Sequence, residues 1–120
     1  MKIRVDPEDR LFSQLIRIMF PICQACHKMR STQVHHWKGR RHQSVRFDFD
    51  NAWAVDFGCH RKFEEDSDFA MRMQKKRLGD KYDAFVIKAA SVCKRHDCDK
   101  KLIRKWLRAE IVKLGETPVC

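Results

Sequence analysis

The stretch STQVHHWKGRRHQSVRFDFDNAWAVDFGCHRKFEED, residues 31–66, decides the fold of this chain. Its β-branched and aromatic residues over 32–37 and again over 45–55 predict two short strands, because such side chains pack well on a pleated surface. The basic segment over 38–44 is expected to join them as a loop. A helix is then expected to begin near residues 58–59. The stretch therefore predicts a two-stranded hairpin followed by a helix.

The sequence before this hairpin has the spacing of an amphipathic helix over residues 6–20. Asp6 is expected to cap it, Pro7 suits its first turn, and Pro21 ends it. Its expected buried stripe consists of Leu11, Phe12, Leu15, Ile16 and Met19. The predicted role of this helix is to pack against the core.

More helices are predicted after the hairpin. Ser67 is expected to cap one that ends at Gly79, and Asp80 is expected to cap the next. The last helix is expected over residues 99–114. Its predicted buried stripe consists of Leu102, Ile103, Trp106, Leu107, Ile111 and Leu114. The predicted fold class is therefore α+β, with one short hairpin among several helices.

At 120 residues the chain is long enough for one domain with a modest core. We expect a single domain over 1–120, made of the first helix (6–20), a central motif (22–66) and a helical C-terminal extension (67–120). No apolar run approaches the roughly 18 residues that a transmembrane helix needs. The first ten residues also lack the apolar core of a signal peptide. These features predict a cytoplasmic protein with no membrane partner.

The chain is strongly basic, with 26 Lys and Arg residues against 16 Asp and Glu residues and a formal net charge of +10. An excess of this size in a small domain indicates a polyanionic partner, and nucleic acid is the commonest one. The basic residues are spread along the whole chain, which favours a folded basic face over a disordered arm.

Cysteine spacing predicts a structural zinc site. Cys23 and Cys26 have the C-x2-C spacing that lets two thiolates share one tetrahedral zinc ion, and Cys59 is a third candidate ligand. Either Asp56 or His27 is a candidate for the fourth. A cytoplasmic protein keeps its thiols reduced, which favours metal ligation over a disulfide framework. The rival interpretation is that the thiols only pack in the core.

Two adjacent histidines suggest a second site. Neighbours on a strand point to opposite faces, so His35 and His36 suit different tasks: one can bind a divalent ion while the other activates a water molecule. His60 and Glu64 are one helical turn apart and share a face. The side chain of Asn51 is expected to bond the backbone and so fix the loop that bears the histidines. Taken singly, each of these residues is more commonly an ordinary polar surface or turn residue.

The basic loop predicts contacts with nucleic acid, because guanidinium groups bind phosphates with forked hydrogen bonds. The predicted contact residues are Trp37, Lys38, Arg40, Arg41, Arg46 and Arg61. No helix carries the pattern of base-specific readout, so affinity is expected to be mainly electrostatic. Trp37 is a candidate for stacking on unpaired bases, whereas core packing is the expected role of Trp53 and Trp106.

The order Cys-x2-Cys, His-His, an asparagine fifteen residues on and a Cys-His pair nine residues further resembles the HNH endonuclease family. In layout, residues 11–90 are similar to the lambdoid phage recombination nucleases of the NinG/Rap type. The resemblance implies a ββα-metal fold in which His36 is the general base and Asn51 is the orienting asparagine. It implies catalytic metal binding by His35 and His60, and Glu64 stands where some relatives place a third metal ligand, usually a histidine.

The same resemblance places Cys23, Cys26 and Cys59 at the structural zinc. Asp56 departs from it, because many zinc-bearing relatives have cysteine at that position. The implied reaction is metal-dependent hydrolysis of DNA, with Mg²⁺ or Mn²⁺ at the catalytic site and products that carry 5′-phosphate and 3′-hydroxyl ends. The implied substrate is double-stranded or branched DNA in phage recombination, which would place the enzyme in the cytoplasm of a bacterial host.

Several alternatives stay open at this point. The chain is either such a nuclease or a zinc-stabilised nucleic-acid-binding module on a scaffold that no longer cuts, and a role on RNA is a third option. A homodimer would suit a junction-resolving enzyme, which must cut two symmetric strands. Cys93, His96 and Cys98 are candidates for a second metal site, although their irregular spacing favours a loop with incidental thiols.

Overall fold

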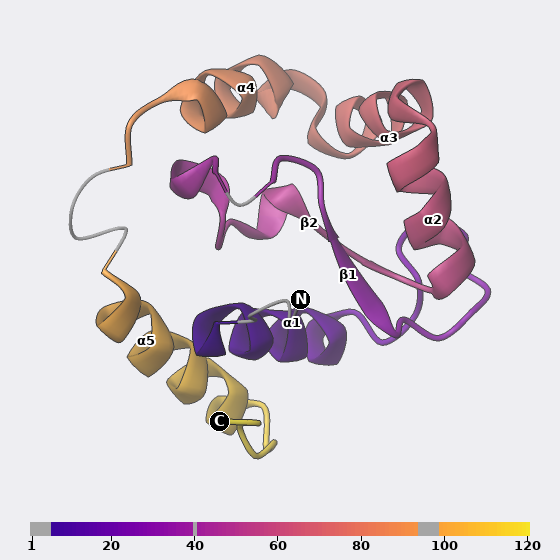
Figure 1. Ribbon diagram of the computed structural model, residues 1–120. Coiled ribbons are helices and arrows are strands. Elements are labelled where there is room, and N and C mark those ends of the chain that lie inside the picture. Colours follow the sequence, from indigo (N-terminus) through magenta and orange to yellow (C-terminus); the bar gives the residue numbers. More distant parts are fainter. Residues whose placement is uncertain (1–5, 40, 94–98) are drawn as a thin grey trace, which may run out of the picture.

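The computed structural model describes residues 6–39, 41–93 and 99–120. Its α-helices are α1 (Pro7–Met19), α2 (Phe57–Glu65), α3 (Ser67–Leu78), α4 (Tyr82–Ala90) and α5 (Lys100–Lys113), and its strands are β1 (Gln33–His36) and β2 (Ala52–Val55). Short 3-10 turns lie at η1 (Gln43–Val45), η2 (Phe49–Asn51) and η3 (Gly79–Lys81). The predicted α+β class is confirmed (Figure 1).

The two strands form an antiparallel hairpin in which His35 pairs with Trp53 and His36 with Ala52. The second strand is shorter than predicted. Residues 45–51 form 3-10 turns and connections instead, and the carboxylate of Asp48 accepts the backbone N–H of Asp50 at 2.9 Å. Aspartate favours such local backbone bonds, and these compete with strand pairing. The strand prediction for 45–51 was therefore wrong, whereas that for 52–55 is confirmed.

Helices cover both faces of the hairpin. On one face lie α1 and α5, whose side chains pack with Ala52 and Ala54 of β2. On the other face Trp53 and Val55 pack against Phe63 of α2. All four residues of β2 are buried, which is why AWAV reads as a continuous apolar run with no alternation. Figure 1 shows α1 and α5 side by side beneath the hairpin, with α2, α3 and α4 around the rest.

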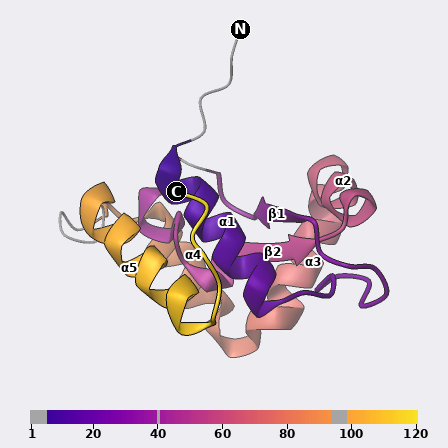
Figure 2. The same cartoon turned by 90° about the horizontal axis from the view of Figure 1, so that it is seen from below.

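The first and last helices share one apolar core although they stand far apart in the sequence. Figure 2 shows α5 running beside α1, with the C-terminal tail folded back over α1. Gln14 of α1 holds that tail, because its side chain donates to the carbonyl of Thr117 at 2.7 Å and accepts the backbone N–H of Val119 at 2.9 Å. The helical extension is thus packed into the same body as the N-terminal helix.

The predicted buried stripes were too wide. Ile103, Leu107 and Ile111 are buried in α5 as predicted. Other members of the predicted stripes are substantially exposed, namely Met19, Leu102, Trp106 and Leu114. The reason is geometric, because α5 packs against α1 through one narrow line of side chains spaced four residues apart.

Two predicted caps also differ. Asp66, not Ser67, caps α3, and its carboxylate accepts the N–H of Phe69 at 3.0 Å. Asp80 does not cap α4, because the chain continues from α3 through η3 directly into α4. Gly79 has a φ of 54°, which glycine adopts without the steric penalty of a side chain, so it ends α3 as predicted.

Among the described residues no helix has the length and apolarity required to cross a membrane.

Candidate metal centres and catalytic site

The predicted cysteines meet at the start of α2. The sulfur atoms of Cys23, Cys26 and Cys59 and a carboxylate oxygen of Asp56 all lie within 4.8 Å of one another. Cys26 Sγ donates to Asp56 Oδ2 at 3.1 Å. Three thiols and one carboxylate are a donor set that zinc accepts in tetrahedral geometry. The cluster could therefore hold a metal ion, as predicted for structural zinc.

The backbone around the first cysteine pair forms a tight turn. The N–H of Cys23 donates to the carbonyl of Met29 at 2.8 Å, and the N–H of His27 donates to the carbonyl of Cys23 at 2.9 Å. His27 has a φ of 58° and is exposed. The structure therefore brings Asp56, and not the alternative His27, to the three thiols.

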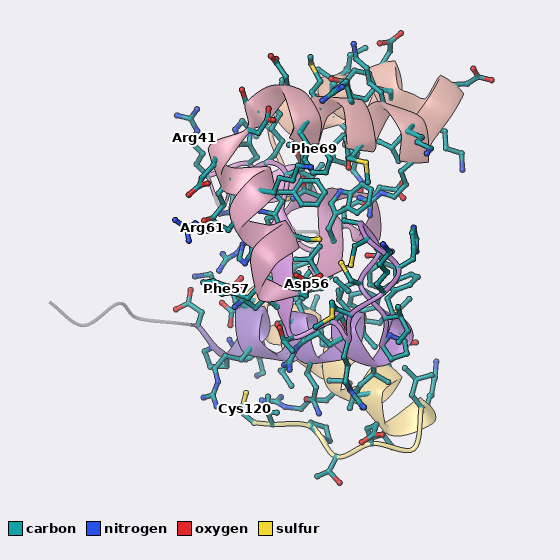
Figure 3. All side chains as sticks on the ribbon, turned by 90° about the vertical axis from the view of Figure 1, so that its right-hand side faces the viewer. Arg41, Asp56, Phe57, Arg61, Phe69 and Cys120 are labelled. Atoms are coloured by element: carbon teal, nitrogen blue, oxygen red, sulfur yellow. The ribbon has the colours of Figure 1, made fainter. Side chains whose placement is uncertain are left out.

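Asp56 serves two neighbours at once. Its Oδ1 accepts the N–H of Cys59 at 3.0 Å and so caps α2, while its Oδ2 faces Cys26. The Cys59 bond and the Cys26 thiol hold the pKa of this carboxyl well below its usual range, so it is ionised. Figure 3 shows Asp56 at the lower end of α2, where its label marks the beginning of the helix.

Burial and the neighbouring Asp56 carboxylate raise the pKa of the Cys59 thiol. Backbone N–H groups of Lys28 and Met29 act in the opposite direction on Cys26 and lower the pKa of its thiol. Without a cation the cluster thus holds at least one neutral thiol. A divalent cation favours the thiolate form of each ligand, so metal binding is expected to release protons.

A second cluster lies between β1 and α2. One ligand atom from each of His35, His60 and Glu64 lies within 4.8 Å of the others. His60 Nε2 is 3.1 Å from Glu64 Oε1, which is the contact expected of residues one helical turn apart. Two imidazoles and a carboxylate suit a divalent ion with free coordination positions.

The surroundings of His35 favour a neutral ring. Its imidazole stacks on Phe63 with a centroid separation of 5.0 Å and meets the His60 ring edge-on at 5.3 Å. Burial, with the charges of His60 and His36, lowers the pKa of His35 to about 4. The ring is therefore unprotonated near neutral pH, and a lone pair is available for a cation.

Gln33 is a site residue that the sequence did not reveal. Its side-chain Oε1 lies 2.5 Å from His60 Nδ1, which makes Gln33 the acceptor of a hydrogen bond from that nitrogen. The bond leaves His60 Nε2 directed at Glu64. Partners of this kind fix the tautomer and orientation of a ligand histidine. Strand alternation was the available signal, because Gln33 and His35 lie on the same face of β1.

His36 faces the other side of the hairpin. Its ring lies 5.7 Å from the ring of Phe12 in α1, whereas His35 contacts α2. His35 and His36 therefore point to opposite faces of the strand, as predicted for adjacent strand residues. The structure brings His35, His60 and Glu64 together. His36 follows His35 in the sequence but does not belong to this group.

Asn51 is fully buried and bridges the two ends of the hairpin loop. Its Oδ1 accepts the N–H of Lys38 at 2.8 Å, and its Nδ2 donates to the carbonyl of Lys38 at 3.0 Å. The backbone of Trp37 is also held, because its N–H donates to the carbonyl of Asn51 at 2.9 Å. This is the backbone contact predicted for Asn51, and it fixes the chain directly after His36.

One predicted nucleic-acid contact was wrong. Arg46 is 3% exposed, and its guanidinium bonds Asp9 at 3.0 and 2.5 Å and Asp6 at 3.3 Å. A buried arginine needs partners of opposite charge, and these lie almost forty residues away where a local pattern cannot show them. Arg46 therefore ties the segment after the hairpin loop to α1, and it does not reach solvent.

The other predicted nucleic-acid contact residues differ in their exposure and in the partners they already have. Arg41 and Arg61 are exposed, and Figure 3 shows both projecting from the same edge of the molecule. Arg61 also pairs with Glu65 at 2.9 Å. Lys38 places its ammonium 4.9 Å from the Trp37 ring centroid. Arg40 lies outside the described residues.

The three tryptophans differ in their burial. Trp53 is buried as predicted, and its Nε1 donates to Gln74 at 2.8 Å. Trp37 packs on Tyr82 and Phe85 of α4 and is only partly exposed, which leaves little of its ring for a base. Trp106, predicted to lie in the core, is 41% exposed.

The second metal site considered at Cys93, His96 and Cys98 depends on residues 94–98, which lie outside the described residues.

No family model matches this chain, and neither a curated protein nor a solved structure matches it. The resemblance to HNH endonucleases therefore rests on the sequence motifs alone.

Proposed function

We propose that this protein is a metal-dependent endonuclease of the HNH type, with a ββα-metal core formed by β1, β2 and α2. The observation that carries the proposal is the convergence of His35, His60 and Glu64 within 4.8 Å at the junction of hairpin and helix. Asn51 supports it by fixing the loop that follows His36. The substrate is DNA, in keeping with the net charge of +10.

His35, His60 and Glu64 would hold the catalytic cation. When bound there, Mg²⁺ or Mn²⁺ supplies a Lewis acid that neutralises charge on the scissile phosphate and on the leaving 3′-oxygen. His35 contributes a neutral ring in a pocket that Phe63 shields, and Gln33 sets the direction of the His60 ring. The hard oxygen of Glu64 favours these ions over softer ones.

His36 is the proposed general base, which takes a proton from the attacking water and leaves 5′-phosphate and 3′-hydroxyl products. It must be neutral to do so. Because its ring lies on the opposite face of β1 from His35, the DNA strand would have to reach both faces at the edge of β1 that does not pair with β2. Arg41 and Arg61 project from one edge of the molecule and are the proposed phosphate contacts (Figure 3).

Zinc at the cysteine cluster is the proposed structural element. The three thiols and Asp56 join the turn before β1 to the first turn of α2. A cation there would hold α2 against the hairpin, and α2 carries His60 and Glu64. The setting in phage recombination or branched-DNA processing rests on the family resemblance alone.

The test is cleavage of supercoiled plasmid by purified protein with Mg²⁺ or Mn²⁺. We expect nicking by the wild type and a loss of at least about 100-fold for His60→Ala and for His36→Ala. DNA binding should be retained in both variants. A His36→Ala variant that cuts at the wild-type rate would remove His36 from the mechanism while leaving the cation site in place.

A non-catalytic DNA-binding module is the second candidate. The placement of the His36 ring against Phe12, away from His35 and His60, favours it. Wild-type protein that binds DNA but never nicks plasmid, linear or four-way-junction DNA with either metal would make this the better account.

A further inference from the structure

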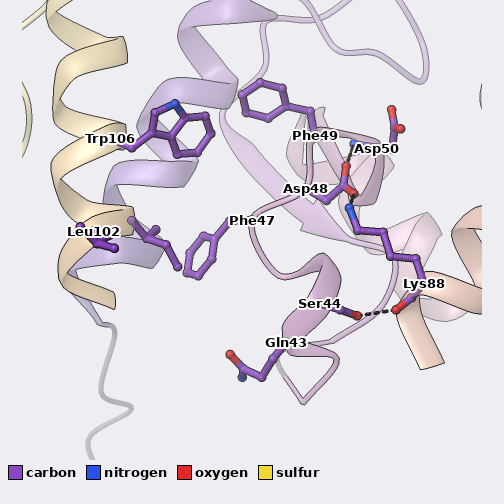
Figure 4. A pocket seen from close by; sticks show the side chains of 10 residues that line it. Gln43, Ser44, Phe47, Asp48, Phe49, Asp50, Lys88, Leu102 and Trp106 are labelled. Carbon is purple, nitrogen blue, oxygen red and sulfur yellow. Dashed lines mark hydrogen bonds and ion pairs between the residues drawn. The ribbon is translucent and has the colours of Figure 1, made fainter. Parts of the chain in front are cut away.

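A hollow between α5 and the segment that leads into β2 is not used by the proposed catalytic site. Its volume is about 720 Å³, within the range of about 300–1,000 Å³ typical of small-ligand pockets. Figure 4 shows Trp106 and Leu102 of α5 near Phe49 and Phe47, with Asp48, Asp50 and Lys88 of α4 on the other side of the hollow.

One wall of this hollow, here called the Trp106 pocket, is aromatic. Trp106 stacks on Phe49 with a centroid separation of 5.9 Å and an interplanar angle of 28°. Both rings remain well exposed, at 41% and 36%. Phe47 and the exposed side chain of Leu102 continue the same wall. A flat ring therefore has an open aromatic surface on which to stack.

The other wall is polar and carries more negative than positive charge. Asp48 and Asp50 line it together with Lys88, whose ammonium lies 2.7 Å from Asp48 Oδ2. Gln43 adds an amide. Two carboxylates against one ammonium repel a phosphate but accept N–H groups, which nucleobases carry on their edges. The chemistry fits an uncharged, planar ring with hydrogen-bonding edges.

A row of rings connects the Trp106 pocket with the proposed base. The His36 ring lies 5.7 Å from Phe12, Phe12 stacks on Phe49 at 6.0 Å, and Phe49 stacks on Trp106 at 5.9 Å. The pocket and His36 are thus on the same face of the hairpin. A DNA strand that reaches His36 would therefore approach the face of the hairpin that also bears the pocket.

Exposed lysines precede two residues of the aromatic wall in the sequence of α5. Lys101 and Lys105 precede Leu102 and Trp106 on α5, and all four are exposed. Positive charge beside an aromatic platform is the usual design of single-strand binding surfaces, where lysines follow the backbone and rings stack on bases.

We propose that the Trp106 pocket binds an unpaired nucleobase of the DNA substrate, by stacking on Trp106 and by hydrogen bonds to Asp48, Asp50 or Gln43. The inference rests on the proposed nuclease function, and it names the substrate class as DNA with unpaired bases. Fully paired duplex cannot fill the pocket, because its bases are enclosed in the stack.

The experiment compares two fluorescein-labelled duplexes, one fully paired and one with a single-base bulge, by anisotropy without a catalytic metal. Wild-type protein should prefer the bulged DNA, and Trp106→Ala should lower its affinity for that DNA by about 10-fold with little change for paired DNA. Trp106→Phe keeps a ring and should retain the preference. Val112→Ala, at an exposed position of α5 outside the pocket, is the matched control.

Equal wild-type affinity for both DNAs would overturn the inference, as would a Trp106→Ala variant with an unchanged preference. The melting temperature of each variant identifies misfolding, and if Trp106→Ala misfolds, the wild-type comparison of bulged with paired DNA decides the inference. Plasmid nicking separates the two proposals. Wild-type protein that prefers the bulge but never nicks supports the pocket and contradicts the nuclease, and nicking without any preference does the reverse.

Discussion

The two clusters of this protein differ in their donors and in their exposure. The cysteine cluster offers three sulfurs and one oxygen, with Cys23 fully buried. The histidine cluster offers two nitrogens and one oxygen, and its Glu64 is 62% exposed. Soft donors in a closed arrangement suit a structural ion, whereas borderline and hard donors that face solvent leave positions for a substrate. This difference is the basis for proposing a structural ion at one cluster and a catalytic ion at the other.

The largest effect should come from the buried thiol. Cys23→Ala removes one zinc ligand and leaves a gap beside Trp53 and Phe63, so we expect a loss of at least about 3 kcal/mol in the free energy of unfolding. Thermal denaturation with metal counting by native mass spectrometry measures both. Cys120→Ser, at an exposed free cysteine, should change neither. If Cys23→Ala keeps its stability and its zinc, the cluster is not structural.

The histidine cluster should show the opposite pattern. Glu64→Gln removes a charged oxygen ligand, so we expect Mn²⁺ affinity to fall by roughly 10- to 100-fold with almost no change in melting temperature. Glu65→Gln is the matched control, because its partner Arg61 forms only an exposed ion pair. Isothermal titration with Mn²⁺ gives the affinities. Equal affinities in the two variants would show that Glu64 is no ligand.

Gln33 tests whether the second cluster is preorganised. Gln33→Leu removes the acceptor for His60 Nδ1, so we expect Mn²⁺ affinity and cleavage to fall by about 10-fold while zinc content stays the same. Gln33→Glu keeps an acceptor and should restore most of the affinity. A Gln33→Leu variant with wild-type Mn²⁺ binding would leave Gln33 with a purely structural role.

The smallest effect concerns the fourth zinc ligand. Asparagine caps helices as well as aspartate does, so Asp56→Asn should keep the start of α2 and lower zinc affinity by a few-fold only, since three thiolates remain. Asp66→Asn, which changes the cap of α3 in the same way, serves as the control. Competition with a chromophoric chelator measures the affinity. A decrease equal to that of Cys23→Ala would make Asp56 as important as a thiolate.

Local pattern was enough to predict much of this structure. The strand over 52–55 and the helix that begins near Gly58 follow from short-range spacing. Spacing along a helix also anticipated the contact between His60 and Glu64. Elements and ligand pairs of this kind are set by backbone geometry, which a sequence displays directly.

The remaining features depend on contacts between distant segments. Arg46 reads as one more residue of a basic loop, yet Asp9 of α1 holds it in the interior. Trp106 reads as part of an apolar stripe, yet α1 covers only the adjacent line of α5. In both cases the contact that decides burial comes from a distant segment of the chain, and the residues nearby in the sequence do not indicate it.

A cysteine in place of Asp56 would change both the metal cluster and the start of α2. A sulfur there would complete an all-thiolate set and bind zinc more tightly, but cysteine is a weaker helix cap than aspartate. Compared with cysteine, Asp56 would bind the ion less tightly, but its carboxylate caps the first turn of α2. If this cluster binds zinc, the same carboxylate both faces the ion and caps the helix that carries His60, so the proposed zinc binding and the start of α2 would be coupled.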